Sequence, residues 1–162
     1  MDLQKAVLDA LNMQMNAEFY SSQLYLSLAN WFESRSLDGF AHWFKKQAEE
    51  ERGHGMDFMQ YILDRNQLPS IGALEAPPAT WDAPLAVVQA ALDHEIKVSS
   101  LILTLNDLSV KENDVPTMVF LERFVKEQVE EESTARNLVD RVKLADSGTG
   151  LLVLDKRLGK RE

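Results

Sequence analysis

The chain has 162 residues, of which 45% are hydrophobic and 27% are charged, an ordinary balance for a globular domain with a sizeable core. Its formal net charge of −9 argues against a nucleic-acid binder, which needs a basic face, and is compatible with binding cations. Because there is no cysteine, disulfides, thiolate metal sites and thiol nucleophiles are all excluded.

The chain carries no sequence signal for secretion or for a membrane. The N-terminal stretch "MDLQKAVLDALNMQ" has no basic segment followed by a continuous apolar one, so we expect no signal peptide. No stretch approaches the roughly 20 apolar residues of a membrane span. The expected location is the cytoplasm, with neither membrane nor nucleic acid as a partner.

Five helices are predicted in chain order. Breaks at "SRSLDG" (34–39), "NQLPSIGALEAPPATWDAP" (66–84), "KENDVP" (111–116) and "DSGTG" (146–150) separate four long segments with helical periodicity, and a short apolar tail follows. We expect helices over about 3–34, 38–66, 84–111, 115–145 and 150–159, within one domain that spans residues 1–162.

These helices predict an all-α four-helix bundle with a short fifth C-terminal helix. The first and third connections are short, so each joins two antiparallel helices. A helix of 28 residues is about 42 Å long, and the second connection can stretch to about 56 Å. It can therefore cross the whole bundle and make the second and third helices parallel. A loose hairpin between those two helices is the disfavoured alternative, because a long loop inside a compact domain is uncommon.

The inward-facing seam of each long helix is apolar at its ends and polar near its middle. Following steps of three and four residues, the seams run from Leu8 to Phe32, Phe44 to Tyr61, Leu85 to Ile102 and Leu121 to Val142. Their central polar members are Glu18, Tyr25, Glu51, His54, Glu95, Gln128 and Glu131.

Four carboxylates at one level of a bundle indicate a metal site. An unpaired buried carboxylate costs several kcal/mol or takes up a proton, and His54 alone cannot compensate four of them. Two divalent ions would balance the charge and leave the imidazole neutral, the form that ligates. Carboxylates with one imidazole suit Fe(II), Mn(II) or Zn(II). Taken singly, a Glu-x-x-His pair is usually solvated and Tyr25 would be an ordinary core residue, so the agreement across four helices carries the prediction.

The sequence resembles the bacterial non-haem ferritins over essentially the whole chain. The resemblance is carried by "NAEFYSSQLYLSLANWF" (16–32), "EEERGHGMDFMQYI" (49–62), "HE" (94–95), "FVKEQVEEE" (124–132) and "DKRL" (155–158). It implies a ferroxidase-active, H-type-like subunit that oxidises Fe(II) to Fe(III) with O2 or peroxide. It also implies a 24-subunit shell that stores ferric oxyhydroxide mineral, with the fifth helix lining pores and an unidentified reductase releasing the iron.

The resemblance also assigns roles to individual residues. The implied di-iron centre is held by Glu18, Glu51, His54, Glu95 and Glu131, with Glu51 bridging the two irons. Tyr25 and Gln128 are implied as its hydrogen-bonding neighbours. A third iron site on the cavity side is implied at Glu50, Glu127 and Glu130, with Glu131 shared.

Close relatives of this family differ at recognisable positions. Bacterioferritins have a second Glu-x-x-His and bind haem through methionine, whereas this chain has Gln128 and Glu131, and Arg52 follows Glu51; we therefore expect no haem. The acids that line three-fold pores in animal ferritins correspond to Met118 and Leu121, which puts the animal-type iron route in doubt. Gly53 and Gly55 stand beside the expected ligands, where they either give those side chains room to move or reflect close packing against the first helix or a second subunit.

Two alternatives to iron storage stay open at this stage. The first is a di-iron oxidase or peroxidase on the same bundle that acts on an organic substrate without storing mineral. The second is a non-catalytic bundle with a vestigial site. The chain has no insertion that would build a substrate pocket, and the short C-terminal helix favours a cage, so storage is the leading prediction.

Overall fold

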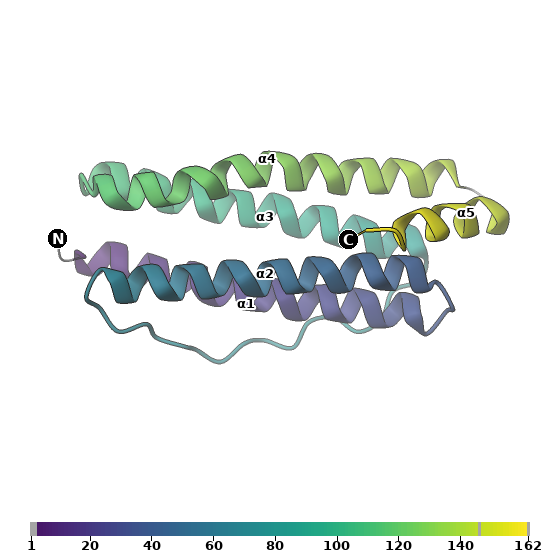
Figure 1. The fold of residues 1–162 in the computed structure, drawn as a ribbon, viewed down its shortest axis with the longest axis horizontal. Helices are drawn as coiled ribbons and strands as arrows, with labels where there is room; N and C mark the ends of the chain where they lie inside the picture. The colour runs from purple at the N-terminus through teal and green to yellow at the C-terminus, as the bar shows by residue number, and fades with distance from the viewer. Residues whose placement is uncertain (1–2, 146, 162) are drawn as a thin grey trace.

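The computed structural model describes residues 3–145 and 147–161, and it is built from helices alone over these ranges (Figure 1). The helices are α1 (Lys5–Glu33), α2 (Asp38–Asp64), α3 (Pro84–Lys111), α4 (Val115–Leu144) and α5 (Gly148–Leu158). The predicted all-α bundle with a short fifth helix is confirmed. Within the described ranges, no helix has the length and apolar character that crossing a membrane requires.

Local backbone chemistry explains where the helix ends differ from expectation. We expected the second helix to reach residue 66, but α2 ends at Asp64 because Asn66 adopts a left-handed backbone with φ 57°. We expected the fifth helix to begin at residue 150. It begins at Gly148 instead, because the Ser147 hydroxyl accepts a hydrogen bond from the backbone N–H of Gly150 and caps the first turn.

The long crossover after α2 runs the length of the bundle, as predicted. Figure 1 shows it returning along α1, so that α2 and α3 point the same way while α1/α2 and α3/α4 are antiparallel pairs. Side chains of α1 hold it by hydrogen bonds. Asn12 Oδ1 accepts from Ser70 N at 2.7 Å and Asn16 Oδ1 accepts from Gly72 N at 2.8 Å. The loop is therefore an ordered strap on α1.

Two hydrophobic clusters fill the two ends of the bundle. One is centred on Phe32, Phe40 and Phe44 and includes residues of α5, and the other is centred on Phe58 and Phe124. The predicted seams mostly face these clusters. Leu85 is an error of prediction: it is 37% exposed because it lies in the first turn of α3, outside the core.

The two positions that correspond to pore acids of animal ferritins, Met118 and Leu121, differ in burial. Leu121 is fully buried in the second cluster, so its side chain cannot line a pore. Met118 is half-buried, and the exposed Glu122 forms an ion pair with Lys126 one turn along α4. Of these three residues only Glu122 is acidic, and it is exposed on the surface of the subunit.

Gly53 and Gly55 have different surroundings in α2. A methyl group on Gly55 would come within 2.6 Å of the Phe19 ring, whereas one on Gly53 would meet nothing within 4 Å. Close packing of α1 against α2 therefore explains Gly55, and no contact in the subunit explains Gly53.

This difference predicts opposite effects of two matched substitutions. Gly53→Ala should raise the free energy of unfolding by about 0.5–1 kcal/mol, because alanine favours the helix. Gly55→Ala should lower it by about 1 kcal/mol, because overpacking against Phe19 outweighs the same gain. Chemical denaturation of the two variants checks this, and equal stabilisation by both would contradict the close packing.

Candidate metal centre

A layer of buried polar side chains separates the two hydrophobic clusters. Each of the four long helices contributes at least one member at this level, which is the arrangement that the seams predicted. The buried polar residues of the layer are Gln14, Glu18, Ser21, Ser22, Gln47, Glu51, His94, Glu95 and Gln128. Such a layer weakens the core unless its polar atoms are paired or bind something.

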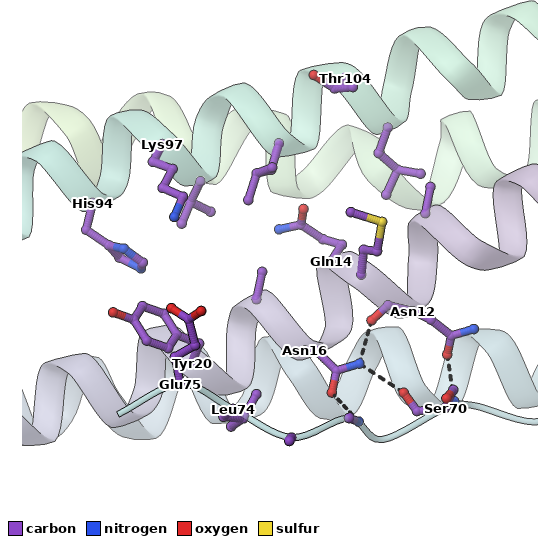
Figure 2. Close-up of a pocket in the computed structure, with 18 of the residues that line it drawn as sticks. Asn12, Gln14, Asn16, Tyr20, Ser70, Leu74, Glu75, His94, Lys97 and Thr104 are labelled. Carbon is purple, nitrogen blue, oxygen red and sulfur yellow. Dashed lines mark hydrogen bonds between the residues drawn. The ribbon is translucent and has the colours of Figure 1, made fainter. Parts of the chain in front are cut away.

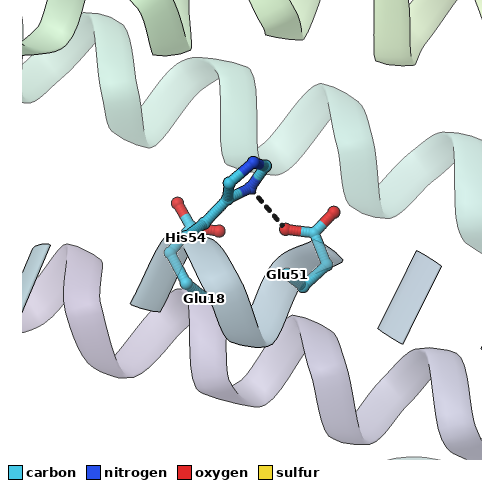
Figure 3. Close-up of side chains that lie close together, drawn as sticks. All are labelled: Glu18, Glu51 and His54. Atoms are coloured by element: carbon cyan, nitrogen blue, oxygen red, sulfur yellow. Dashed lines mark hydrogen bonds and ion pairs between the residues drawn. The ribbon is translucent and has the colours of Figure 1, made fainter. Parts of the chain in front are cut away.

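Glu18, Glu51 and His54 form the tightest group in this layer. Figure 3 shows Glu18 on α1 with Glu51 and His54, one turn apart, on α2. Each residue offers one ligand atom within 4.8 Å of the others. His54 Nδ1 lies 3.2 Å from Glu51 Oε2. Two carboxylates and an imidazole at this spacing suit a divalent transition metal.

Two glutamines orient the carboxylates. Gln14 Nε2 donates to Glu18 Oε1 at 2.6 Å, and Gln47 Nε2 donates to Glu51 Oε1 at 3.1 Å and to Glu131 Oε2 at 3.0 Å. Sequence reasoning did not assign either glutamine to the site. The available signal is local, because each stands one helical turn before its glutamate, where side chains meet.

Glu95 and its neighbours complete the layer from α3 and α4. The Tyr25 hydroxyl donates to Glu95 Oε1, and Gln128 Nε2 donates to Glu95 Oε2 at 3.1 Å. Both neighbours are thus where the resemblance put them. The structure thus places Glu18, Glu51 and His54 together, and Glu131 shares the Gln47 amide with Glu51. That Glu95 and Glu131 bind a second ion stays a prediction.

Burial and mutual repulsion give these acids unusual pKa values. Burial, followed by the charge of Glu51, raises the pKa of Glu18 to about 8 and that of Glu95 to about 8. Burial, followed by the charge of Glu50, raises the pKa of Glu131 to about 7. Without a metal these carboxyls therefore hold protons near neutral pH.

The pair formed by Glu51 and His54 shifts in the opposite sense. Although burial opposes it, the hydrogen bond and charge of His54 lower the pKa of Glu51. Burial likewise lowers the pKa of His54, but the hydrogen bond and charge of Glu51 outweigh it and raise that pKa to about 9. Without a metal, the imidazolium of His54 thus supplies positive charge that a bound metal would supply instead.

Two carboxylate oxygens of the site are buried without a hydrogen-bond partner. They are Glu18 Oε2 and Glu127 Oε2, among the residues that the structure describes. A buried hydrogen-bond acceptor without a donor is costly, so both oxygen atoms are suited to bind a cation. Glu127 Oε2 lies 3.6 Å from His54 Nε2, so this oxygen faces the imidazole.

The residues expected at a third iron site are less tightly grouped. Glu127 faces His54, Glu130 is exposed, and Glu50 Oε2 accepts a hydrogen bond from Arg161 Nη2 at 2.8 Å. The charge of Glu50 still raises the pKa of Glu131, so these two acids are near one another. A third site stays a prediction, and Glu50 would have to leave Arg161 to take part.

A cavity of about 780 Å³ lies behind the acidic layer, between α1, α3 and the crossover loop (Figure 2). Its wall includes Gln14 and His94. His94 Nε2 lies 2.8 Å from the Ser21 hydroxyl, and burial lowers the pKa of His94 to about 4, so this imidazole is neutral. Gln14, whose Nε2 donates to Glu18, therefore connects the cavity wall to the acidic layer. Sequence analysis did not predict this cavity.

A bundle with a long crossover, a short fifth helix and a central carboxylate–histidine layer defines the class of ferritin-like helical proteins. Residues 8–145 match the family model described as "Ferritin: Ferritin-like domain". The chain belongs to the ferritin family.

Individual relatives resemble the chain over nearly their whole lengths. A bacterial non-heme ferritin of Bacteroides fragilis (strain 638R) is 42% identical over 153 residues, covering 94% of this chain and 96% of the relative. A bacterial non-heme ferritin of Staphylococcus aureus (strain USA300) is 34% identical over 160 residues, covering 98% and 96%.

Solved structures share the fold closely. An open-pore ferritin from the hyperthermophilic archaeon Archaeoglobus fulgidus has a TM-score of 0.97 at 38% identity, covering 99% of this chain and 98% of that chain. A closed form of the A. fulgidus ferritin, engineered by site-directed mutagenesis, has a TM-score of 0.98 at 38% identity, covering 99% of both chains.

The pKa values predict that metal binding displaces protons. Glu18, Glu95 and His54 are mostly protonated at pH 7, but ligation requires carboxylate anions and neutral imidazole. The affinity for Zn(II) should therefore rise with pH between 7 and 9, the range of the raised pKa values. Calorimetry at pH 7 in two buffers with different ionisation enthalpies measures the protons released. A heat of binding that does not depend on the buffer would contradict the protonated layer.

Proposed function

We propose that this protein is an iron-storage ferritin subunit that oxidises Fe(II) at the layer around Glu18, Glu51 and His54. The observation that carries the proposal is this buried group of two carboxylates and an imidazole, with Glu18 Oε2 lacking any hydrogen-bond donor. Membership of the ferritin family and the non-heme ferritin relatives support iron as the natural metal.

In the proposed centre, two Fe(II) ions are the substrate. Glu18 and His54 would hold one ion, Glu95 and Glu131 would hold the other, and Glu51 would be shared between them. Each pair of ions would give two electrons either to O2, which takes up two protons and becomes H2O2, or to H2O2, which takes up two protons and becomes two waters. The ligand carboxylates would already have lost their protons when the ions bound. Tyr25 and Gln128 hold Glu95 through its two oxygens and so fix the direction of this ligand.

Loss of two ligands should abolish the fast reaction. We expect the initial rate of aerobic Fe(II) oxidation to fall at least tenfold in Glu51→Ala and in His54→Ala. Each substitution removes a side chain that would bind iron directly in the proposed centre. The measurement is anaerobic Fe(II) titration to count bound irons, followed by exposure to O2 with absorbance recorded in time.

Glu49→Ala is the matched control for this experiment. Glu49 is exposed on the same turn and its carboxylate forms an ion pair with Lys46, so the control variant should react like the parent. If Glu51→Ala oxidised Fe(II) as fast as Glu49→Ala, the proposed centre would be wrong.

The proposed assembly is a hollow shell of 24 copies, in keeping with the cage-forming relatives. We expect a particle of about 440 kDa, twenty-four times the 18.4 kDa chain, in size-exclusion chromatography with light scattering. Electron microscopy of the same sample would show whether its pores resemble the open or the closed A. fulgidus form. A dimer or monomer as the largest species would contradict the storage role.

The cavity behind the layer supports one competing function, a di-iron oxidase or peroxidase acting on an organic substrate. Its wall residue Gln14 donates to Glu18, so a molecule in the cavity would lie one side chain from the proposed centre. Iron retention separates the two functions. A storage protein keeps far more iron per subunit than its ligands can hold, whereas an oxidase keeps only the ligated ions.

A further inference from the structure

Arg161 follows the last helix in sequence, yet its side chain lies against the N-terminal half of α2. Its Nη1 donates to Gln47 Oε1 at 3.0 Å and to the Trp43 carbonyl oxygen at 3.3 Å, and its Nη2 donates to Glu50 Oε2 at 2.8 Å. Its guanidinium carbon lies 4.8 Å from the centre of the Trp43 ring. One cation thus meets four groups on a single helix.

The packing of α5 against the start of α2 fixes this position. A methyl group on Gly39 would overlap the backbone oxygen of Asp155, so the two helices touch where Gly39 lacks a side chain. Asp155 Oδ1 accepts from Phe40 N at 2.9 Å, and the backbone oxygen of Arg161 lies 2.7 Å from His42 Nε2. The tail is therefore held along α2 by both side-chain and backbone atoms.

Arg161 determines which way the Gln47 amide faces. A guanidinium only donates hydrogen bonds, so the amide oxygen of Gln47 must face it. The amide nitrogen is then left for Glu51 and Glu131, whose carboxylates accept. The reverse orientation would set the amide nitrogen against a cation and its oxygen against two carboxylates. Without Arg161, only the carboxylates would favour the observed orientation.

We propose that Arg161 is a positioning residue of the metal centre, acting through Gln47 on Glu51 and Glu131. With Glu51 Oε1 and Glu131 Oε2 held by the Gln47 amide, Glu51 Oε2 and Glu131 Oε1 would remain to bind a metal. The same guanidinium also binds Glu50, one of the acids expected at a third site. This inference rests on the proposed function, and it makes the C-terminal tail part of the centre.

The inference is tested by titrating the metal-free protein with Zn(II) in a calorimeter at pH 7.5. Arg161→Gln should weaken Zn(II) binding about tenfold or more, because the loss of a residue that orients metal ligands commonly has this effect. Lys160→Gln removes the same charge from the exposed neighbouring position and should bind like the parent. Arg161→Lys keeps the charge but not the forked geometry and should fall between them.

A double-mutant cycle separates positioning from a general structural role. If Arg161 acts through Gln47, then Arg161→Gln should cause no further loss of Zn(II) affinity in a Gln47→Ala background. An equal loss in both backgrounds, or parent-like binding by Arg161→Gln, would overturn the inference. If Arg161→Gln does not assemble, the Arg161→Lys variant carries the cycle instead.

The same titration distinguishes failure of this inference from failure of the proposed function. Parent protein that binds Zn(II) no better than the combined Glu51→Ala, His54→Ala variant would remove the metal centre itself. Tight binding by the parent together with unchanged binding by Arg161→Gln would remove only the positioning role.

Discussion

The burial of several carboxylates at one level of a helical bundle is the constraint on which this structure depends. Charges that repel one another in a poorly solvated layer must be neutralised, and the protein does this in its metal-free state with protons and with the imidazolium of His54. When a divalent cation binds, the carboxyl groups can lose their protons and the imidazolium of His54 can become neutral. The electrostatic cost of burying these carboxylates together is therefore also what would favour the binding of a cation.

The bundle tolerates this polar layer because two apolar clusters enclose it. Stacked aromatic rings at Phe32, Phe40 and Phe44 hold one end, and Phe58 with Phe124 holds the other. Since hydrophobic stabilisation scales with apolar area removed from water, the ends can hold the helices in place while the middle is used for chemistry. Rigid ends also fix the spacing of ligands that come from different helices.

Amide side chains have a distinct role between these extremes. Gln14, Gln47 and Gln128 each donate to a carboxylate, which stabilises the anion without adding a charge that would compete with the metal. In the proposed mechanism they fix the direction of oxygens whose protonation changes during turnover. Arg161 extends this scheme to the C-terminal tail, which joins the helix expected at the pores to the layer expected to oxidise iron.

The sequence by itself determined the helices, the crossover and the acidic members of the polar layer. Those features follow from local periodicity, because a helix fixes which side chains share a face whatever packs against it. For this reason the sequence could predict that Glu18, Glu51 and Glu95 face inward near the middle of their helices. Their roles as metal ligands stay a prediction.

Only the tertiary structure decided contacts between residues far apart in the chain. Arg161 reaches Gln47 across 114 positions, and no repeat or spacing in the sequence indicates it. The contact of Gly55 with Phe19, the burial of Leu121 and the cavity beside His94 likewise depend on how neighbouring helices are rotated and spaced. Periodicity gives the face of a helix, but the depth and partner of each side chain are set by packing between helices.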